Sequence, residues 1–244
     1  MIDAATHSGD PPQVVDFMQS PLQACTELIE RLVGDRLAGL TAYGAVLDAD
    51  FDVARMTATC VLVLREIDLS LLRRLAEHGP KLGAKHMAAP IVMTPAYISA
   101  SLDTFPLELL EIHQHHKTLA GDDHFADMEI QPEHLRLQCE REFKRILIRL
   151  RQGLLAAAGR EQVLEELQID VGQHVMRAAR GLLWLKGERH YARREEVLDA
   201  CRRLASVSLD GVRSALDLYG EHGPQQFDAI YHDVERLARV ADEL

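Results

Sequence analysis

The pattern of hydrophobic and polar positions changes near residue 130. Before that point, short apolar runs alternate with helical patterns, and several runs end at a glycine or proline. The segment ATCVLVL at 58–64 is a continuous β-prone run and predicts a buried strand. Shorter apolar runs predict three further strands, at 39–47, 89–94 and 105–112. Apolar residues at helical spacing predict helices in this half at 14–34, 69–79 and 95–103.

After Pro132 the apolar residues recur every three or four positions, which is typical of amphipathic helices. The first helix is expected at 132–159, because proline suits a first helical turn and Gly159 suits a C-terminal end. Further helices are expected at 161–186, 193–205, 208–220 and 224–242. The predicted fold class is therefore α+β, with a small mixed sheet and flanking helices followed by an all-α helical bundle.

These patterns divide the chain into three parts. Residues 1–12 are polar, contain proline and glycine, and are expected to form a flexible N-terminal tail. Residues 13–130 are expected to form an α/β domain, and residues 131–244 a helical bundle domain. The composition, with 47% hydrophobic and 27% charged residues, is that of an ordinary globular protein with ample material for a core.

The formal net charge of −11 is unevenly distributed. Residues 1–130 hold 9 Lys and Arg against 19 Asp and Glu, whereas residues 131–244 hold 18 against 19. An acidic first half repels polyanions, so nonspecific binding to nucleic acid is not expected. A local basic stripe in the second half is still compatible with binding of one phosphate group.

Cysteine spacing and hydropathy indicate the compartment. The cysteines are far apart and form no CxxC pair, so they are expected to be reduced core residues rather than zinc ligands. No stretch approaches 18 apolar residues, and the first residues carry neither a basic nor an apolar signal region. We therefore expect a cytoplasmic protein without a membrane partner.

The segment GLTAYGAVLDADFDVARMTATCVLVL, residues 39–64, joins two predicted strands through a glycine turn and an acidic loop. A strand, glycine turn, acidic loop and second strand, followed by a helical domain, resemble the nucleotidyltransferase superfamily with its polymerase-β-like and kanamycin-nucleotidyltransferase-like members. DFDVAR at 50–55 resembles the loop that precedes the catalytic Asp-x-Asp pair in a bacterial branch of that superfamily. The similarity extends over roughly residues 15–155 and implies that residues 13–130 are a nucleotidyltransferase-like domain.

The resemblance implies a site that has lost its usual metal ligands. Active members carry Gly-Ser after the first strand; here Gly44 and Ala45 stand at these positions and would lie at the nucleotide. The Asp-x-Asp pair falls on Thr57 and Thr59, which we regard as degenerate metal positions because a neutral hydroxyl binds Mg²⁺ poorly. The third carboxylate of the family would correspond to Glu108 or Glu111 on the predicted strand at 105–112.

Other acids could rebuild a site. Asp50 and Asp52 alternate in DADFD, and an extended loop would point both to one side. They are candidate catalytic residues together with Glu108 and Glu111. Metal binding by this loop, a solvated acidic turn and helix capping remain alternatives. No metal site or cofactor is predicted, and Mg²⁺ is expected only if such relocated carboxylates support catalysis.

Two clusters in the chain carry further candidate chemistry. The histidines of HQHH, residues 113–116, could bind a transition metal if Glu111 or Asp122 joined them, or they could simply be solvated. On the first helix of the bundle, basic residues at i, i+4 and i+8 form a stripe that could hold nucleotide phosphate or pair with neighbouring acids. These candidate nucleotide-binding residues are Arg141, Arg145 and Arg149.

The sequence leaves three functional hypotheses. The first is a nucleotidyltransferase-like protein with a degenerate metal site, acting as a non-catalytic binding or regulatory scaffold for a nucleotide or protein partner. The second is an active metal-dependent nucleotidyltransferase with relocated carboxylates. The third is a structural or oligomerising protein, because the apolar helical faces at 143–154 and 171–185 could pack between identical subunits.

Overall fold

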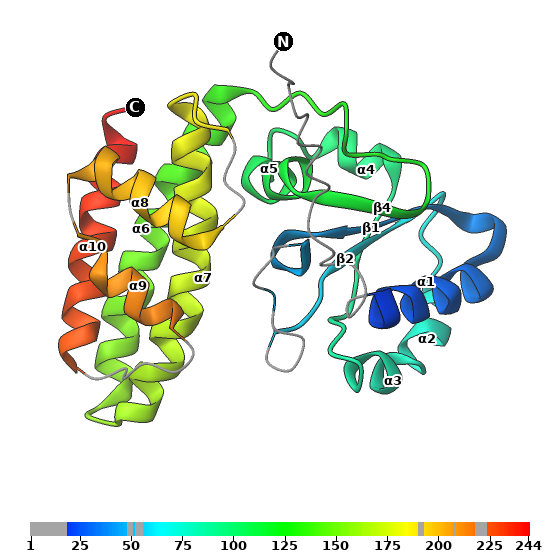
Figure 1. Ribbon diagram of the computed structural model, residues 1–244, viewed down its shortest axis with the longest axis horizontal. Helices are drawn as coiled ribbons and strands as arrows, with labels where there is room; N and C mark the ends of the chain where they lie inside the picture. Colours follow the sequence, from blue (N-terminus) through cyan, green and yellow to red (C-terminus); the bar gives the residue numbers. More distant parts are fainter. Residues whose placement is uncertain (1–18, 48–50, 52–55, 190–192, 207, 218–223) are drawn as a thin grey trace, which may run out of the picture.

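The computed structural model describes most of the chain. The described residues are 19–47, 51, 56–189, 193–206, 208–217 and 224–244. They form a small mixed sheet with helices on both of its faces, beside a bundle of longer helices (Figure 1). The predicted α+β class, with a helical region after the sheet, is confirmed.

The sheet of the described residues has four strands in the order β3-β2-β1-β4. β1 pairs antiparallel with both β2 and β4, and β2 pairs parallel with β3. The strands are β1 Leu37–Tyr43, β2 Cys60–Leu64, β3 Ile91–Met93 and β4 His116–Gly121. Every residue of β2 is buried, as its unbroken apolar run predicts for a central strand covered on both faces.

Helices cover the two faces of the sheet with two separate cores. Leu40 and Leu62 pack with α1, α2 and α3 on one face, whereas Val61 and Val63 pack with α4 and α5 on the other. The alternation along β2 follows from the two-residue period of a strand. These helices are α1 Gln19–Val33, α2 Leu69–Ala76, α3 Gly79–Gly83, α4 Pro95–Ala100 and α5 Pro106–Gln114. Two short 3-10 turns, η1 Gly34–Arg36 and η2 Gly44–Leu47, flank β1.

The predicted strand at 105–112 is wrong, because this segment forms helix α5. Pro106 occupies the first helical turn, where its missing N–H costs no hydrogen bond. Leu107 and Leu110 are buried at i, i+3 spacing, and Glu108 and Glu111 share the next face with the same spacing. The fourth strand lies just after the helix as β4, whose polar composition and half-buried edge position hid it from an apolar-run criterion.

The second half of the chain forms the helical bundle that the periodicity predicts. Its helices are α6 Pro132–Ala157, α7 Glu161–Leu185, α8 Arg194–Ala205, α9 Asp210–Leu216 and α10 Pro224–Asp242. Long helices α6 and α7 lie side by side, and α10 packs against α6 and α9. Within the described ranges, none of the helices is both long and apolar enough to cross a membrane.

Helix α5 connects the sheet to the bundle. Its buried leucines belong to the same continuous core as Leu135 and Cys139 of α6 and Leu182 of α7. The approach of α5 to α7 is close, since a Cβ added at Gly181 would lie 2.4 Å from Cδ2 of Leu107. One face of α5 is therefore fixed against the bundle, and its polar residues stand at the edge of that contact.

Candidate functional site

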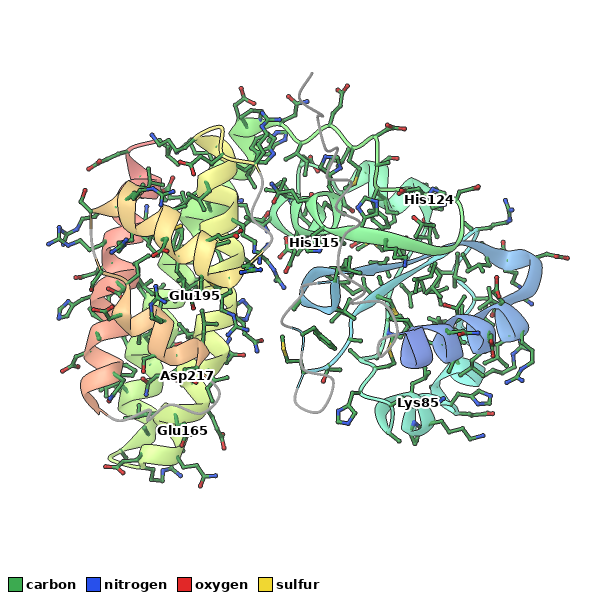
Figure 2. All side chains as sticks on the ribbon, viewed as in Figure 1. Lys85, His115, His124, Glu165, Glu195 and Asp217 are labelled. Carbon is green, nitrogen blue, oxygen red and sulfur yellow. The ribbon has the colours of Figure 1, made fainter. Side chains whose placement is uncertain are left out.

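The glycine turn after β1 is held by hydrogen bonds to the residues that directly precede the two neighbouring strands, β4 and β2. Gly44 adopts φ +72°, a left-handed conformation that favours glycine, and its N–H donates to the carbonyl oxygen of His115 at 3.0 Å. On the other side, the N–H of Tyr43 donates to the carbonyl oxygen of Thr59 at 3.3 Å. Ala45 is exposed in η2, directly after the turn. The turn is thus rigidly anchored at the end of the sheet that His115 marks in Figure 2, on the side toward the bundle.

The two threonines expected at degenerate metal positions differ in their surroundings. Thr59 is half-buried, and its hydroxyl donates to the carbonyl oxygen of Tyr43 at 2.7 Å. Its Oγ1 lies 3.9 Å from the position that a Cβ on Gly44 would occupy. Thr57 is exposed. The Thr59 hydroxyl therefore faces the glycine turn, but its proton serves to hold β1 against β2.

Glu111 brings a carboxylate to the glycine turn from helix α5. Its Oε1 lies 3.8 Å from the position of a Cβ on Gly44. Its Oε2 accepts a hydrogen bond from Nε of Arg177 at 2.8 Å, so a charged pair bridges α5 and α7 beside the turn. The side chains are 25% and 34% exposed, so solvent reaches both partners.

Glu108 lies one helical turn away and is held differently. Its Oε2 accepts a hydrogen bond from Nε2 of Gln138 at 2.7 Å, while its Oε1 is 3.9 Å from Nη1 of Arg177. Gln138 of α6 also accepts a hydrogen bond from the N–H of Leu107 through its Oε1, at 2.7 Å. Both candidate carboxylates are thus engaged by bundle residues, Glu108 mainly by α6 and Glu111 by α7.

The electrostatics of the cluster reflect this pairing. Burial opposes the positive charge of Arg177, yet its pKa is raised above the ordinary value because attraction and hydrogen bonding by Glu111 outweigh burial. Burial, followed by the negative charge of Glu111, raises the pKa of Tyr43. Tyr43, Glu111 and Arg177 therefore form one electrostatic unit beside the turn.

The arginine stripe of α6 lies partly on the side that faces α5. Arg145 and Arg149 follow Gln138 at intervals of seven and eleven residues, which places them on the same side of the helix as this contact. Arg145 pairs with Glu142 at 3.1 Å, and Arg149 pairs with Asp170 of α7 at 2.7 Å. Arg141 is exposed, one turn from Arg145. The stripe thus consists of two acid-paired arginines and one that faces solvent.

A histidine–carboxylate contact lies next to the stripe. Nδ1 of His174 on α7 is 3.2 Å from Oε1 of Glu142, whose side chain is only 13% exposed. The hydrogen bond from His174 is the main reason that the pKa of Glu142 is lowered. His174 precedes Arg177 by three residues, so both lie on one face of α7.

The histidine cluster forms a hydrogen-bonded network after α5. Nδ1–H of His113 donates to the carbonyl oxygen of Phe125 at 2.7 Å, and Nδ1–H of His116 donates to that of His113 at 3.1 Å. Nε2 of His116 lies 3.1 Å from both carboxylate oxygens of Asp123. The network ties the segment after β4 to the end of α5. In the described part of the chain, no three His, Cys, Asp or Glu side chains gather as a metal site.

Two predicted site residues, and one site residue that the sequence did not predict, remain to be placed. Asp50 and Asp52 lie outside the described residues. Arg177 was not predicted, although the apolar stretch VGQHVMRAARGLLWL at 171–185 carries only two basic residues besides a histidine. A charged residue between the buried Met176 and Ala178 signals a partner across a helix contact. Sequence alone did not indicate that the partner is Glu111.

The arrangement of sheet, glycine turn and following helical bundle is a nucleotidyltransferase-like fold. Among solved structures, the chain is similar to the spectinomycin adenyltransferase AAD(9) from Enterococcus faecialis, determined with ATP and spectinomycin. The TM-score is 0.58 at 10% sequence identity, and the alignment covers 89% of this chain and 98% of the other. No protein-family model and no curated protein sequence matches the chain. The similarity confirms the predicted fold.

The magnesium ions that this fold family uses do not fit the described residues. A hard divalent cation prefers several anionic oxygens at 2.0–2.1 Å, roughly the spacing of Mg²⁺ and its ligands in proteins. Around Gly44 the described side chains offer one carboxylate, that of Glu111, and Arg177 already neutralises its charge. Thr59 contributes only a neutral hydroxyl.

Proposed function

We propose that this protein is a nucleotidyltransferase-like scaffold that binds a nucleotide, or a protein partner, without transferring a nucleotidyl group. The observation that carries the proposal is the capture of Glu111 by Arg177 beside the glycine turn. A carboxylate held by a guanidinium is a weak metal ligand, because its negative charge is already compensated. The neutral residues Thr57 and Thr59, where the fold family carries aspartates, support the same conclusion.

Nucleotide binding is the first form of this scaffold role to test. The structurally similar adenyltransferase was solved with ATP, and the rigid turn at Gly44 allows close approach of a phosphate to the backbone. Arg177, which is held by Glu111, is the guanidinium on the bundle side of the turn, whereas Arg145 and Arg149 of the stripe are already paired with Glu142 and Asp170. Calorimetric titration with ATP, CTP and GTP, with and without Mg²⁺, measures this binding directly.

The absence of catalysis is tested separately. The protein is incubated with Mg²⁺, α-labelled ATP and candidate acceptors, and release of pyrophosphate is followed. We expect no enzyme-dependent release above background. Robust Mg²⁺-dependent transfer that disappears in the Glu111→Gln variant would show that Glu111 is catalytic and would replace this proposal with the active-transferase alternative.

The active-transferase alternative requires converging carboxylates. It uses Asp50, Asp52 and either Glu108 or Glu111, which must gather within roughly 5 Å of a common point, the reach of metal-bound oxygens. The two glutamates are engaged by Gln138 and Arg177. Mg²⁺ titration of the protein, read by calorimetry with and without ATP, tests whether such a site forms.

The oligomerisation hypothesis stays a prediction, although most of the apolar surface on which it was based is buried. Much of the apolar faces at 143–154 and 171–185 is buried inside the bundle, where Phe143, Leu150 and Val175 are at most 1% exposed. The exposed large apolar residues of α6 are Leu137 at 37%, Ile148 at 53%, Leu154 at 48% and Leu155 at 82%. Light scattering on eluted fractions measures whether the protein self-associates.

A further inference from the structure

Glu111 occupies a position that an anionic ligand would need. Its carboxylate touches the space above Gly44 with Oε1 and binds Arg177 with Oε2. A phosphate that approached the backbone of the left-handed turn from the bundle side would meet this carboxylate before it reached the arginine. The ion pair therefore closes the route between the glycine turn and helix α7.

A carboxylate and a phosphate compete for the same chemistry. A carboxylate is a planar oxyanion and a phosphate a tetrahedral one, and both accept parallel hydrogen bonds from a guanidinium. A polyphosphate carries more negative charge than a glutamate. Arg177 has five N–H donors, of which Nε is bonded to Glu111, and Nη1 lies 3.9 Å from the nearer oxygen of Glu108. Among the described residues, the other donors of Arg177 find no hydrogen-bond partner, and the side chain is 34% exposed.

We propose that Glu111 is an internal substitute for a ligand phosphate, which holds Arg177 until a polyphosphate displaces it. The inference rests on the proposed nucleotide binding, and it adds that the site is autoinhibited by its own carboxylate. When Glu111 loses its charge, this role and a catalytic or metal-binding role predict opposite changes in the affinity for polyphosphate. Removing the charge of Glu111 strengthens the binding of polyphosphate without metal, whereas removing a metal ligand weakens the binding that depends on Mg²⁺.

The test uses inorganic tripolyphosphate and ATP as probes in EDTA at low salt. Binding is measured by calorimetry and by the fluorescence of Trp184, the only tryptophan, which Arg189 covers at 4.7 Å. Glu111→Gln is expected to bind tripolyphosphate at least about tenfold more tightly than the natural protein, the scale of one charge-assisted hydrogen bond. Equal or weaker binding by this variant would overturn the inference.

Glu108→Gln is the matched control. It removes one negative charge from the same helix, but the residue is held mainly by Gln138 and leaves the pair of Glu111 and Arg177 intact. Its affinity is expected to stay within about twofold of the natural protein. A gain equal to that of Glu111→Gln would mean that general charge, rather than displacement, controls binding, and would also overturn the inference.

The double variant Glu111→Gln with Arg177→Gln tests whether Arg177 is the group that binds the phosphate. It is expected to lose the gain of the single variant, because the freed arginine is the group that binds the phosphate. Circular dichroism checks that the double variant folds. If it does not fold, the difference in affinity between Glu111→Gln and Glu108→Gln still tests the inference. Tight ATP binding by the natural protein with no gain in Glu111→Gln rejects only the autoinhibition. A gain for tripolyphosphate but no ATP binding rejects only the nucleotide role.

Discussion

Nε of Arg177 lies 2.8 Å from Oε2 of Glu111, and this contact joins helix α7 of the bundle to helix α5 beside the glycine turn. The two residues are 66 positions apart in the chain. Around them, the charge of Glu108 helps to raise the pKa of Arg177, and the charge of Arg177 partly offsets the raised pKa of Tyr43. A charged contact at the rim of a shared apolar core couples the position of α5 to that of the bundle.

Replacing Arg177 by methionine leaves Glu111 charged and partly buried without its partner. We expect a loss of about 1 kcal/mol in the free energy of unfolding, reduced from the value for a fully buried pair because both side chains are solvent-accessible. Urea denaturation measures the loss. Arg145→Met is the control, since Arg145 is 75% exposed and its loss should cost under about 0.5 kcal/mol. Equal costs for the two variants would contradict a special role for Arg177.

Gly44→Ala places a side chain on a residue with φ +72°. The added Cβ has room, because its nearest neighbours lie at 3.8 and 3.9 Å, so the cost comes from the backbone conformation alone. We expect a destabilisation of about 1 kcal/mol, measured by thermal unfolding. Gly79→Ala, at a helical position with open space around it, should not destabilise the protein.

Gly181→Ala tests the contact between the sheet and the bundle. The new methyl group would lie 2.4 Å from Leu107 and 2.7 Å from Sγ of Cys139, inside a closed core. Overpacking of this kind costs about 1–3 kcal/mol, and here it should also push α5 away from α7. Denaturation measures the cost, and the Trp184 emission reports the displacement. Leu155→Ala, at an 82% exposed position, is the reference for a change without packing consequences.

The pair of Glu142 and His174 makes stability depend on pH on the acidic side. Hydrogen bonding by His174 lowers the pKa of Glu142 in the folded protein. Ionised Glu142 therefore stabilises the fold above its ordinary pKa of 4.5, and the contribution disappears as pH falls through the lower folded value. The stability difference between the natural protein and Glu142→Gln should shrink between about pH 5 and pH 3. A difference that stays constant over this range would contradict the assignment.

The buried thiols should be unreactive until the protein unfolds. Burial raises the pKa of Cys139 and of Cys201 to about 12, so almost no thiolate exists at neutral pH. Alkylation by iodoacetamide at pH 8 is expected to label neither residue in the native protein and both in denaturant, as peptide mass spectrometry would show. Rapid labelling of either residue under native conditions would indicate that the bundle opens locally.

The sequence by itself determined the fold class and most of the elements, because these depend on local periodicity. The apolar run at 58–64 contains a central strand, and the pattern after Pro132 gives a bundle of amphipathic helices. Through the resemblance, the sequence also predicts that Thr57 and Thr59 stand at degenerate metal positions, and this stays a prediction. These features require only the chain's own order of residues.

Only the tertiary structure decided what the glutamates at 108 and 111 do. The apolar run FPLELLEI, 105–112, fits either a strand or a buried helix, and packing between the sheet and the bundle made it α5. The helix then turns Glu111 toward Gly44 and brings it to Arg177, a contact between residues far apart in sequence. No local pattern encodes such a pairing, because it depends on how α5, α6 and α7 pack against one another.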